Sequence, residues 1–157
     1  MNMRKGGRQH ASAADLLYLG ADHAGFAQKE ELKKFLAAQG VLVFDIGAHA
    51  YDASDDFPDS ARKLARLVAS NKRRRGILLC GSGQGMCIAA NKIKGIRAAS
   101  AWDEKSAKSA RHDDDVNVLC LGGRMHSLPQ LKKILAAWLD TPFSNLARHK
   151  RRIKKIE

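Results

Sequence analysis

The sequence lacks three features that would assign it to a specialised class: a long apolar run, a cysteine framework and an abundance of aromatic residues. A membrane-spanning helix needs about 20 consecutive apolar residues, and no stretch approaches that length, so we expect no association with a membrane. The basic residues 1–15 have no apolar segment like that of a secretory signal. We expect residues 1–14 to form a disordered extension and residues 15–157 to form a single domain.

The three cysteines are an odd number and lack the paired spacing of zinc ligands. Disulfide frameworks belong to oxidising compartments, so this usage favours a reducing, cytoplasmic setting. Cys87 falls in a helical stretch and Cys120 in an apolar run, where a free cysteine behaves as a small hydrophobic residue. We therefore expect these two to lie in the core.

Acidic residues are scarce: 28 lysines and arginines face 16 aspartates and glutamates, which gives a formal net charge of +12. An excess of this size is common in nucleic-acid-binding proteins. Here, however, the basic residues are spread over 72–75, 148–155 and several helical faces, and aromatic residues make up only 6% of the chain. Single-strand binders need aromatic stacking platforms. The composition therefore favours a small anionic substrate over nucleic acid.

Short apolar runs alternate along the chain with stretches of helical periodicity. The runs of strand length are 16–20, 41–46, 77–79, 96–101 and 116–122. The helical stretches are 26–39, 58–70, 86–92, 103–112, 128–140 and 143–157. This alternation predicts an α/β fold, a Rossmann-like three-layer sandwich with a five-stranded parallel sheet and a C-terminal helix.

A turn rich in glycine, with the sequence GSGQG over residues 81–85, follows the third predicted strand and precedes a helix. Backbone N–H groups at such a turn are unpaired and favour an anion. The spacing G-x-G-x-G matches neither the dinucleotide fingerprint nor a P-loop. Cys80 directly precedes the turn. A thiol near those donors ionises more readily, and the resulting thiolate can act as a base or a nucleophile. The alternative is a tight connection beside a core cysteine.

Polar side chains follow several of the predicted strands. Asp22 and His23 come after the first, Cys80 and Ser82 lie at the end of the third, and Arg124 follows the fifth. The carboxyl ends of parallel strands share one edge of the sheet, where α/β proteins bind ligands. We therefore expect these five residues to form one site.

Six ordered segments resemble the ribose-5-phosphate isomerase B family, which also includes galactose-6-phosphate and allose-6-phosphate isomerases. They are GADHAGF (20–26), DDFPD (55–59), CGSGQGMCIAANK (80–92), GIRAA (95–99), NVLCLGGR (117–124) and RHKRRI (148–153). The resemblance implies an aldose–ketose isomerase for ribose 5-phosphate and ribulose 5-phosphate, with a cis-enediolate intermediate and no metal or other cofactor. It also implies a homodimer or a dimer of dimers, with each active site shared by two subunits.

The same resemblance assigns roles to individual residues. It makes Cys80 the base that moves a proton between C1 and C2, and Ser82 a helper in that transfer. It makes the backbone of the turn an anion hole for the enediolate, formed by Gly81, Gly83, Gln84 and Gly85. The positions that it assigns to the sugar hydroxyls and the phosphate are Asp22, His23, Asp114, Arg124, Arg148 and Arg152.

The chain departs from the family pattern before the fifth strand. The family usually has R-x-H-N there, and its histidine opens the furanose ring; this chain has Arg111, His112, Asp113 and Asp114. Asp113 stands at the histidine position and His112 one residue earlier, so either is a candidate for ring opening. On local sequence alone, 113–115 is a solvated acidic turn. A second departure is Phe57, which replaces a tyrosine.

Because of these two departures, the sequence does not decide between a pentose phosphate and a hexose phosphate as substrate. The alternative substrate is a hexose 6-phosphate, either allose or galactose 6-phosphate. A third reading is a non-catalytic relative that binds nucleic acid through its positive charge. Cys80 beside an intact glycine turn argues against that third reading.

Overall fold

The computed structural model describes residues 16–157, so the extension expected over residues 1–14 lies outside the described part of the chain. Five parallel strands form one sheet with the order β2-β1-β3-β5-β4. The strands are β1 (Leu17–Ala21), β2 (Val43–Asp45), β3 (Arg75–Cys80), β4 (Ala98–Ser100) and β5 (Val118–Gly122). The predicted five-stranded parallel sheet is confirmed.

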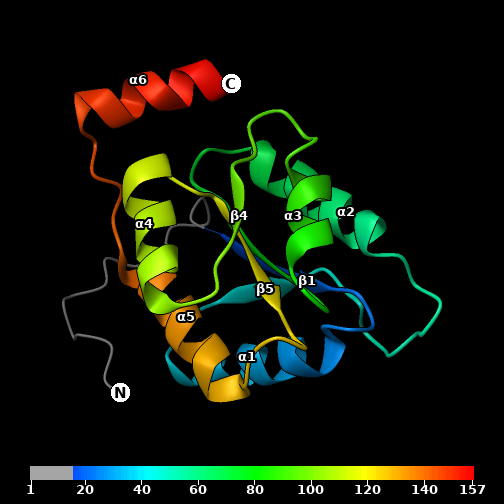
Figure 1. Ribbon diagram of the computed structural model, residues 1–157. Coiled ribbons are helices and arrows are strands. Elements are labelled where there is room, and N and C mark those ends of the chain that lie inside the picture. Colours follow the sequence, from blue (N-terminus) through cyan, green and yellow to red (C-terminus); the bar gives the residue numbers. More distant parts are fainter. Residues whose placement is uncertain (1–15) are drawn as a thin grey trace.

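Six helices accompany the sheet. They are α1 (Phe26–Ala38), α2 (Phe57–Ala69), α3 (Gln84–Ala90), α4 (Glu104–Asp114), α5 (Leu128–Asp140) and α6 (Ala147–Ile156). Helices α1, α4 and α5 cover one face of the sheet, and α2 and α3 cover the other, which makes three layers (Figure 1). Among residues 16–157, no helix is both long and apolar enough to span a membrane.

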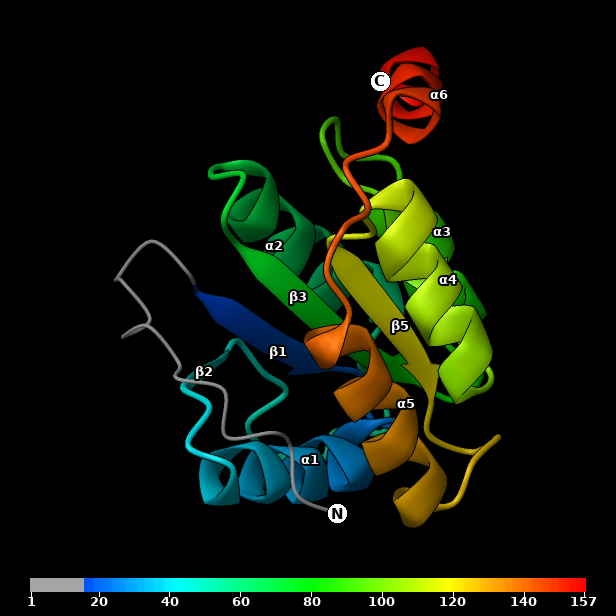
Figure 2. The same cartoon turned by 90° about the vertical axis from the view of Figure 1, so that its left-hand side faces the viewer.

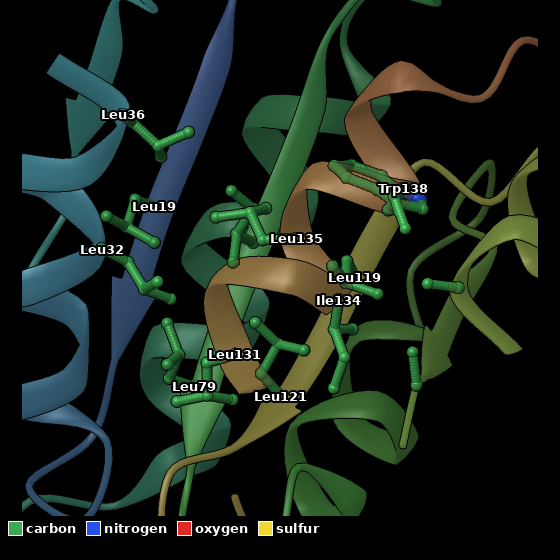
Figure 3. Close-up of a cluster of buried hydrophobic side chains, with 14 of the residues drawn as sticks. Leu19, Leu32, Leu36, Leu79, Leu119, Leu121, Leu131, Ile134, Leu135 and Trp138 are labelled. Carbon is green, nitrogen blue, oxygen red and sulfur yellow. The ribbon is translucent and has the colours of Figure 1, made fainter. Parts of the chain in front are cut away.

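Alternation along the strands divides the core into two clusters, one on each face of the sheet. Leu19, Leu79 and Leu121 point toward α1 and α5, where they pack with other aliphatic side chains and Trp138 (Figure 3). Each fully buried leucine of this kind contributes about 1.5–3 kcal/mol by leaving water. Cys80 belongs to the opposite cluster, under α2 and α3. The period of two thus directs the Cys80 thiol toward the helix that follows the glycine turn.

Helix α1 is attached to β2 through Lys29, whose side chain is fully buried. Its Nζ lies 2.5 Å from Asp45 Oδ2, and Lys33 also donates to this oxygen. Burial alone would raise the pKa of Asp45, but the hydrogen bonds from both lysines lower it to about 2. The other oxygen of Asp45 accepts from Gly47 N, and Gly47 O accepts in turn from Ala21 N at the end of β1. This buried ion pair therefore helps to hold the loop that follows β2 against the end of β1.

Helix α4 is longer than the sequence indicated. It continues through Asp114, two residues beyond the expected end, so Asp113 and Asp114 lie in its last turn rather than in a connector. It ends where Asp115 adopts a left-handed conformation, with φ of 48°, and its carboxylate pairs with Arg97 and Arg111. These two arginines compensate the acidic charge that opposes the helix dipole.

Helix α6 is shorter than expected, because residues 141–146 form an irregular connector. The connector is held to α4 by Ser144 N, which donates to His112 O at 3.0 Å. Helix α6 packs on α4 and buries only His149 among its own residues. It projects beyond the sheet, at the end opposite the tips of β3 and β5 (Figures 1 and 2). Most of its basic side chains are therefore exposed on this chain.

Candidate active site

The glycine turn lies at the carboxyl edge of the sheet and joins β3 to α3. Gly83 has a φ of 81°, which favours glycine, and a Cβ there would lie 3.0 Å from the backbone carbon of Leu121. A Cβ on Gly85 would lie 2.7 Å from the ring of Phe57. Glycine is thus required at position 83 by its backbone conformation and its packing against β5, whereas a side chain at position 85 would have to displace the exposed ring of Phe57 at the start of α2.

Cys80 is the last residue of β3 and is 5% exposed. The backbone N–H of Gly83 donates to its sulfur, with an N–Sγ distance of 3.1 Å. A donor directed at sulfur stabilises a thiolate. Ser82 is exposed beside it, and its hydroxyl oxygen accepts from Gln84 N at 3.3 Å. The turn therefore brings a thiol, a hydroxyl and backbone donors together within a few residues.

Asp22 and His23 lie beyond the end of β1. Asp22 is buried, which raises the pKa of its carboxyl, while the N–H of Gly25 donates to Oδ1 and partly offsets this effect. His23 contacts Asp55 twice, through its backbone N at 2.9 Å and through Nδ1 at 2.7 Å from the same oxygen. The hydrogen bond to Asp55 raises the pKa of His23. Asp55 therefore fixes the imidazole and favours its charged form.

Arg124 follows β5 and returns to the glycine turn. Its backbone N donates to Gly81 O at 3.0 Å, and its guanidinium NH1 lies 3.6 Å from where a Cβ on Gly81 would be. The side chain is exposed and forms no ion pair with any residue of 16–157. A cation thus lies beside the turn and is available to an anionic ligand.

A second polar cluster lies where α4 meets α6. His112 Nδ1 lies 2.7 Å from Asp113 Oδ1, and His149 Nε2 lies 3.8 Å from the same oxygen. The hydrogen bond from His112 lowers the pKa of Asp113. Arg148 and Arg152 are exposed on α6 beside this cluster.

The two groups of predicted site residues lie at opposite edges of the sheet. Cys80 is paired with Gly122, the last residue of β5, whereas α4 ends just before Val118, the first. At about 3.3 Å per residue, β5 alone separates the two edges by about 13 Å. One chain therefore brings Asp22, His23, Cys80, Ser82 and Arg124 together, and it holds the other group elsewhere: His112, Asp113, Asp114, Arg148 and Arg152.

A comparison with known families identifies the architecture. The sequence profile described as Ribose/Galactose Isomerase matches residues 17–156, nearly the whole described chain. The chain belongs to this family. Membership confirms the resemblance noted in the sequence and makes the protein a sugar-phosphate aldose–ketose isomerase.

Curated members of the ribose/galactose isomerase family are similar along most of their length. Ribose-5-phosphate isomerase B of Mycolicibacterium paratuberculosis is 41% identical over 137 residues, which cover 87% of this chain and 86% of the relative. A probable ribose-5-phosphate isomerase B of Mycoplasma pneumoniae is 42% identical over 140 residues, covering 89% and 91%. The similarity thus extends over the whole α/β domain.

Solved structures of family members have the same fold. The ribose-5-phosphate isomerase B of Mycoplasma genitalium, solved with bound ribulose-5-phosphate, superposes with a TM-score of 0.86 at 40% identity, covering 89% of this chain and 92% of that one. The type B enzyme of Trypanosoma brucei superposes with a TM-score of 0.86 at 41% identity, covering 91% and 97%.

Two features of this family member were not predicted from its sequence. Asp55 was not assigned a role, because its contact with His23 joins two loops 32 residues apart and leaves no periodic signal. Cys87 is half-buried rather than a core residue, and a hydrogen bond with Cys120 lowers the pKa of Cys87 to about 7, although burial opposes this shift. A lowered thiol pKa in a predicted core position has no sequence signature.

Proposed function

We propose that this enzyme interconverts ribose 5-phosphate and ribulose 5-phosphate, with Cys80 as the base and with its catalytic domain over residues 15–157. The observation that carries the proposal is the N–H of Gly83 directed at the Cys80 sulfur, 3.1 Å away, at the edge where the glycine turn begins. The relative from Mycoplasma genitalium that was solved with ribulose-5-phosphate supports the choice of sugar.

In the proposed reaction, the Cys80 thiolate removes the proton from C2 of the open-chain aldose. The electron pair of that bond forms a C1–C2 double bond, and the carbonyl oxygen becomes the enediolate oxygen. The proton returns from the thiol to C1, the hydroxyl proton on O2 passes to O1, and O2 becomes the ketone. Ser82 assists the proton transfer, and the backbone N–H groups of Gly81, Gly83, Gln84 and Gly85 stabilise the developing negative charge.

We assign substrate binding to both edges of the sheet, in two subunits. On the edge that carries Cys80, Asp22 accepts from sugar hydroxyls, and His23, whose pKa is raised by its hydrogen bond to Asp55, binds hydroxyls or phosphate together with Arg124. Because Arg148 and Arg152 are exposed at the far edge, we assign the rest of the phosphate clamp to these residues of the partner subunit, with Asp114. The active assembly is then a homodimer, or a dimer of dimers.

The substrate assignment is tested with ribose 5-phosphate, allose 6-phosphate and galactose 6-phosphate. A hexose adds one carbon between the reacting carbons and the phosphate, so a site that fits the pentose misaligns it; we expect kcat/KM to be lower for both hexoses by roughly 10–200-fold. The Cys80→Ser variant, assayed in parallel, excludes a contaminating isomerase. Equal or faster turnover of a hexose phosphate would make the chain a hexose-phosphate isomerase instead.

We propose that His112 rather than Asp113 donates the proton in ring opening. A carboxyl with a lowered pKa is ionised at neutral pH and has no proton to give, whereas it can orient the neighbouring imidazole. Asp113 then holds the imidazole of His112 in place through the hydrogen bond between them. Both residues would serve the active site of the partner subunit.

The test of this role compares the two directions of the reaction. Ribose 5-phosphate is mostly a furanose and must be opened, whereas ribulose 5-phosphate cannot close that ring because its 5-oxygen carries the phosphate. His112→Ala should therefore slow the aldose direction by roughly 10²-fold under single-turnover conditions and slow the ketose direction much less. Equal losses in both directions would assign His112 to binding or folding, and no loss would mean that opening is spontaneous.

A further inference from the structure

Three side chains with metal-binding atoms converge where α4 ends against α6. His112 Nδ1 and His149 Nε2 lie 2.7 Å and 3.8 Å from Asp113 Oδ1, and the two imidazole rings are 6.0 Å apart at 77°. All three ligand atoms lie within 4.8 Å of one another. Ligand atoms around a tetrahedral zinc ion, with bonds of about 2.0–2.2 Å, are about 3.3 Å from each other. The observed separations bracket that value.

The cluster also has outer hydrogen bonds that orient its members. The side chain of His149 is only 6% exposed, and its Nδ1 is hydrogen-bonded to Ser144 Oγ at 2.6 Å, which directs Nε2 toward Asp113. On the other side, Ser109 Oγ donates to Asp113 Oδ2 at 3.2 Å. Metal-binding imidazoles and carboxylates generally have such partners, which fix the tautomer and the orientation.

We propose that His112, Asp113 and His149 bind a divalent transition-metal ion, with Zn²⁺ as the cation that best fits two imidazoles and one carboxylate. Three protein ligands leave a fourth position for water. The proposal does not depend on which sugar the enzyme isomerises, and the ion is not needed for the proposed thiol chemistry. Coordination uses the Nδ1 of His112 that faces Asp113, so an ion bound there and ring opening by His112 exclude each other in the same chain. It assigns a binding property to a segment in which this chain differs from the family pattern.

The other group of three potential ligands in the described chain, Asp22, His23 and Asp55, fits such an ion less well. It offers a single imidazole. The backbone N and the ring Nδ1 of His23 both contact the same carboxylate oxygen of Asp55 already. Asp22 Oδ1 is likewise occupied by Gly25 N. Zn²⁺ prefers imidazole to carboxylate ligands, so the cluster with two histidines is the stronger site.

The experiment uses the chelator-treated full-length protein and Co²⁺ as a spectroscopic probe, with binding measured by its visible absorption and by calorimetry. We expect one ion per chain, bound with the spectrum of a four- or five-coordinate site. His112→Gln and Asp113→Asn should each weaken binding by roughly tenfold or more, because even outer partners of metal ligands contribute 10–100-fold. Ser144→Ala should weaken it less, by changing only the orientation of His149.

Two control variants separate this site from non-specific binding. His49→Ala removes an exposed imidazole whose Nδ1 lies 4.0 Å from Asp45 Oδ1. Among residues 16–157 this pair has no third ligand, so Co²⁺ affinity should not change. Asp55→Asn disables the other cluster and should also leave it unchanged. Circular dichroism verifies that each variant is folded; His112 is half-exposed, so its substitution is informative even if changes at buried His149 disturb folding.

The proposal is overturned if His112→Gln and Asp113→Asn bind Co²⁺ as tightly as the unmodified chain. It is also overturned if Asp55→Asn alone abolishes binding. A sulfur-to-cobalt charge-transfer band that disappears in Cys80→Ser would place the ion at the thiolate and have the same consequence. Binding that is lost in both ligand variants and kept in both controls supports it.

Discussion

Cys80→Ser is expected to lower kcat by roughly 10²–10⁴-fold, the contribution of a well-placed general base, while the fold stays intact. A serine hydroxyl fits the space of the thiol and can still accept from Gly83 N, but it does not ionise near neutral pH. Steady-state turnover of ribose 5-phosphate measures the loss, and a thermal unfolding curve checks the fold. A variant that retains full turnover would remove Cys80 from the mechanism.

Cys87→Ser is the matched control for this experiment. Cys87 lies on α3 seven residues further along, where it is half-buried and packs against the core cluster that contains Cys80, and its pKa of about 7 favours reaction with alkylating agents. Inactivation by iodoacetamide is therefore informative only in the Cys87→Ser background. There we expect nearly normal turnover, loss of activity on alkylation, and protection by substrate.

Mixing two inactive variants should restore activity if the site is shared between subunits. Cys80→Ser damages one edge of the sheet and Arg152→Ala the other, so a heterodimer contains one site with both defects and one with neither. Random exchange gives heterodimers as half of all dimers, and we expect recovery of about a quarter of the unmodified activity. The measurement is turnover before and after subunit exchange, with exchange verified by mass spectrometry of the intact assembly.

The pair Cys80→Ser and Arg124→Ala is the control for this mixture. Arg124 lies on the same edge as Cys80, through its hydrogen bond to Gly81, so every site of that heterodimer keeps one defect. No recovery is expected there. Recovery in both mixtures would point to an artefact of exchange, and recovery in neither, after verified exchange, would contradict the shared site.

The positions of the strands were predictable because burial on both faces gives continuous apolar runs, and parallel order aligns their carboxyl ends. That rule alone brings Asp22, Cys80 and Arg124 to one edge. The contact of His23 with Asp55 was not predictable, since it depends on the path of an irregular loop. Sequence patterns constrain residues on regular elements much more strongly than residues on loops.

The end of α4 shows a second limit of the sequence. Three consecutive aspartates predict an early helix end, because negative charge opposes the C-terminal dipole. Arg97 and Arg111 reverse this outcome by pairing with Asp115, and Arg97 approaches from a different part of the chain. Part of the charge that offsets the aspartates therefore comes from a distant part of the chain, which local propensity cannot anticipate.

The strand order also determines when the site can form during synthesis. Strand β4 pairs only with β5, and β5 lies between β3 and β4 although it is made last. At about 5–20 residues per second, roughly 1–4 s pass between the completion of β4 at Ser100 and that of β5 at Gly122. Until then the glycine turn lacks the backbone of Leu121 against which Gly83 packs. A nascent chain thus completes the edge that carries the proposed site only after β5 has left the ribosome.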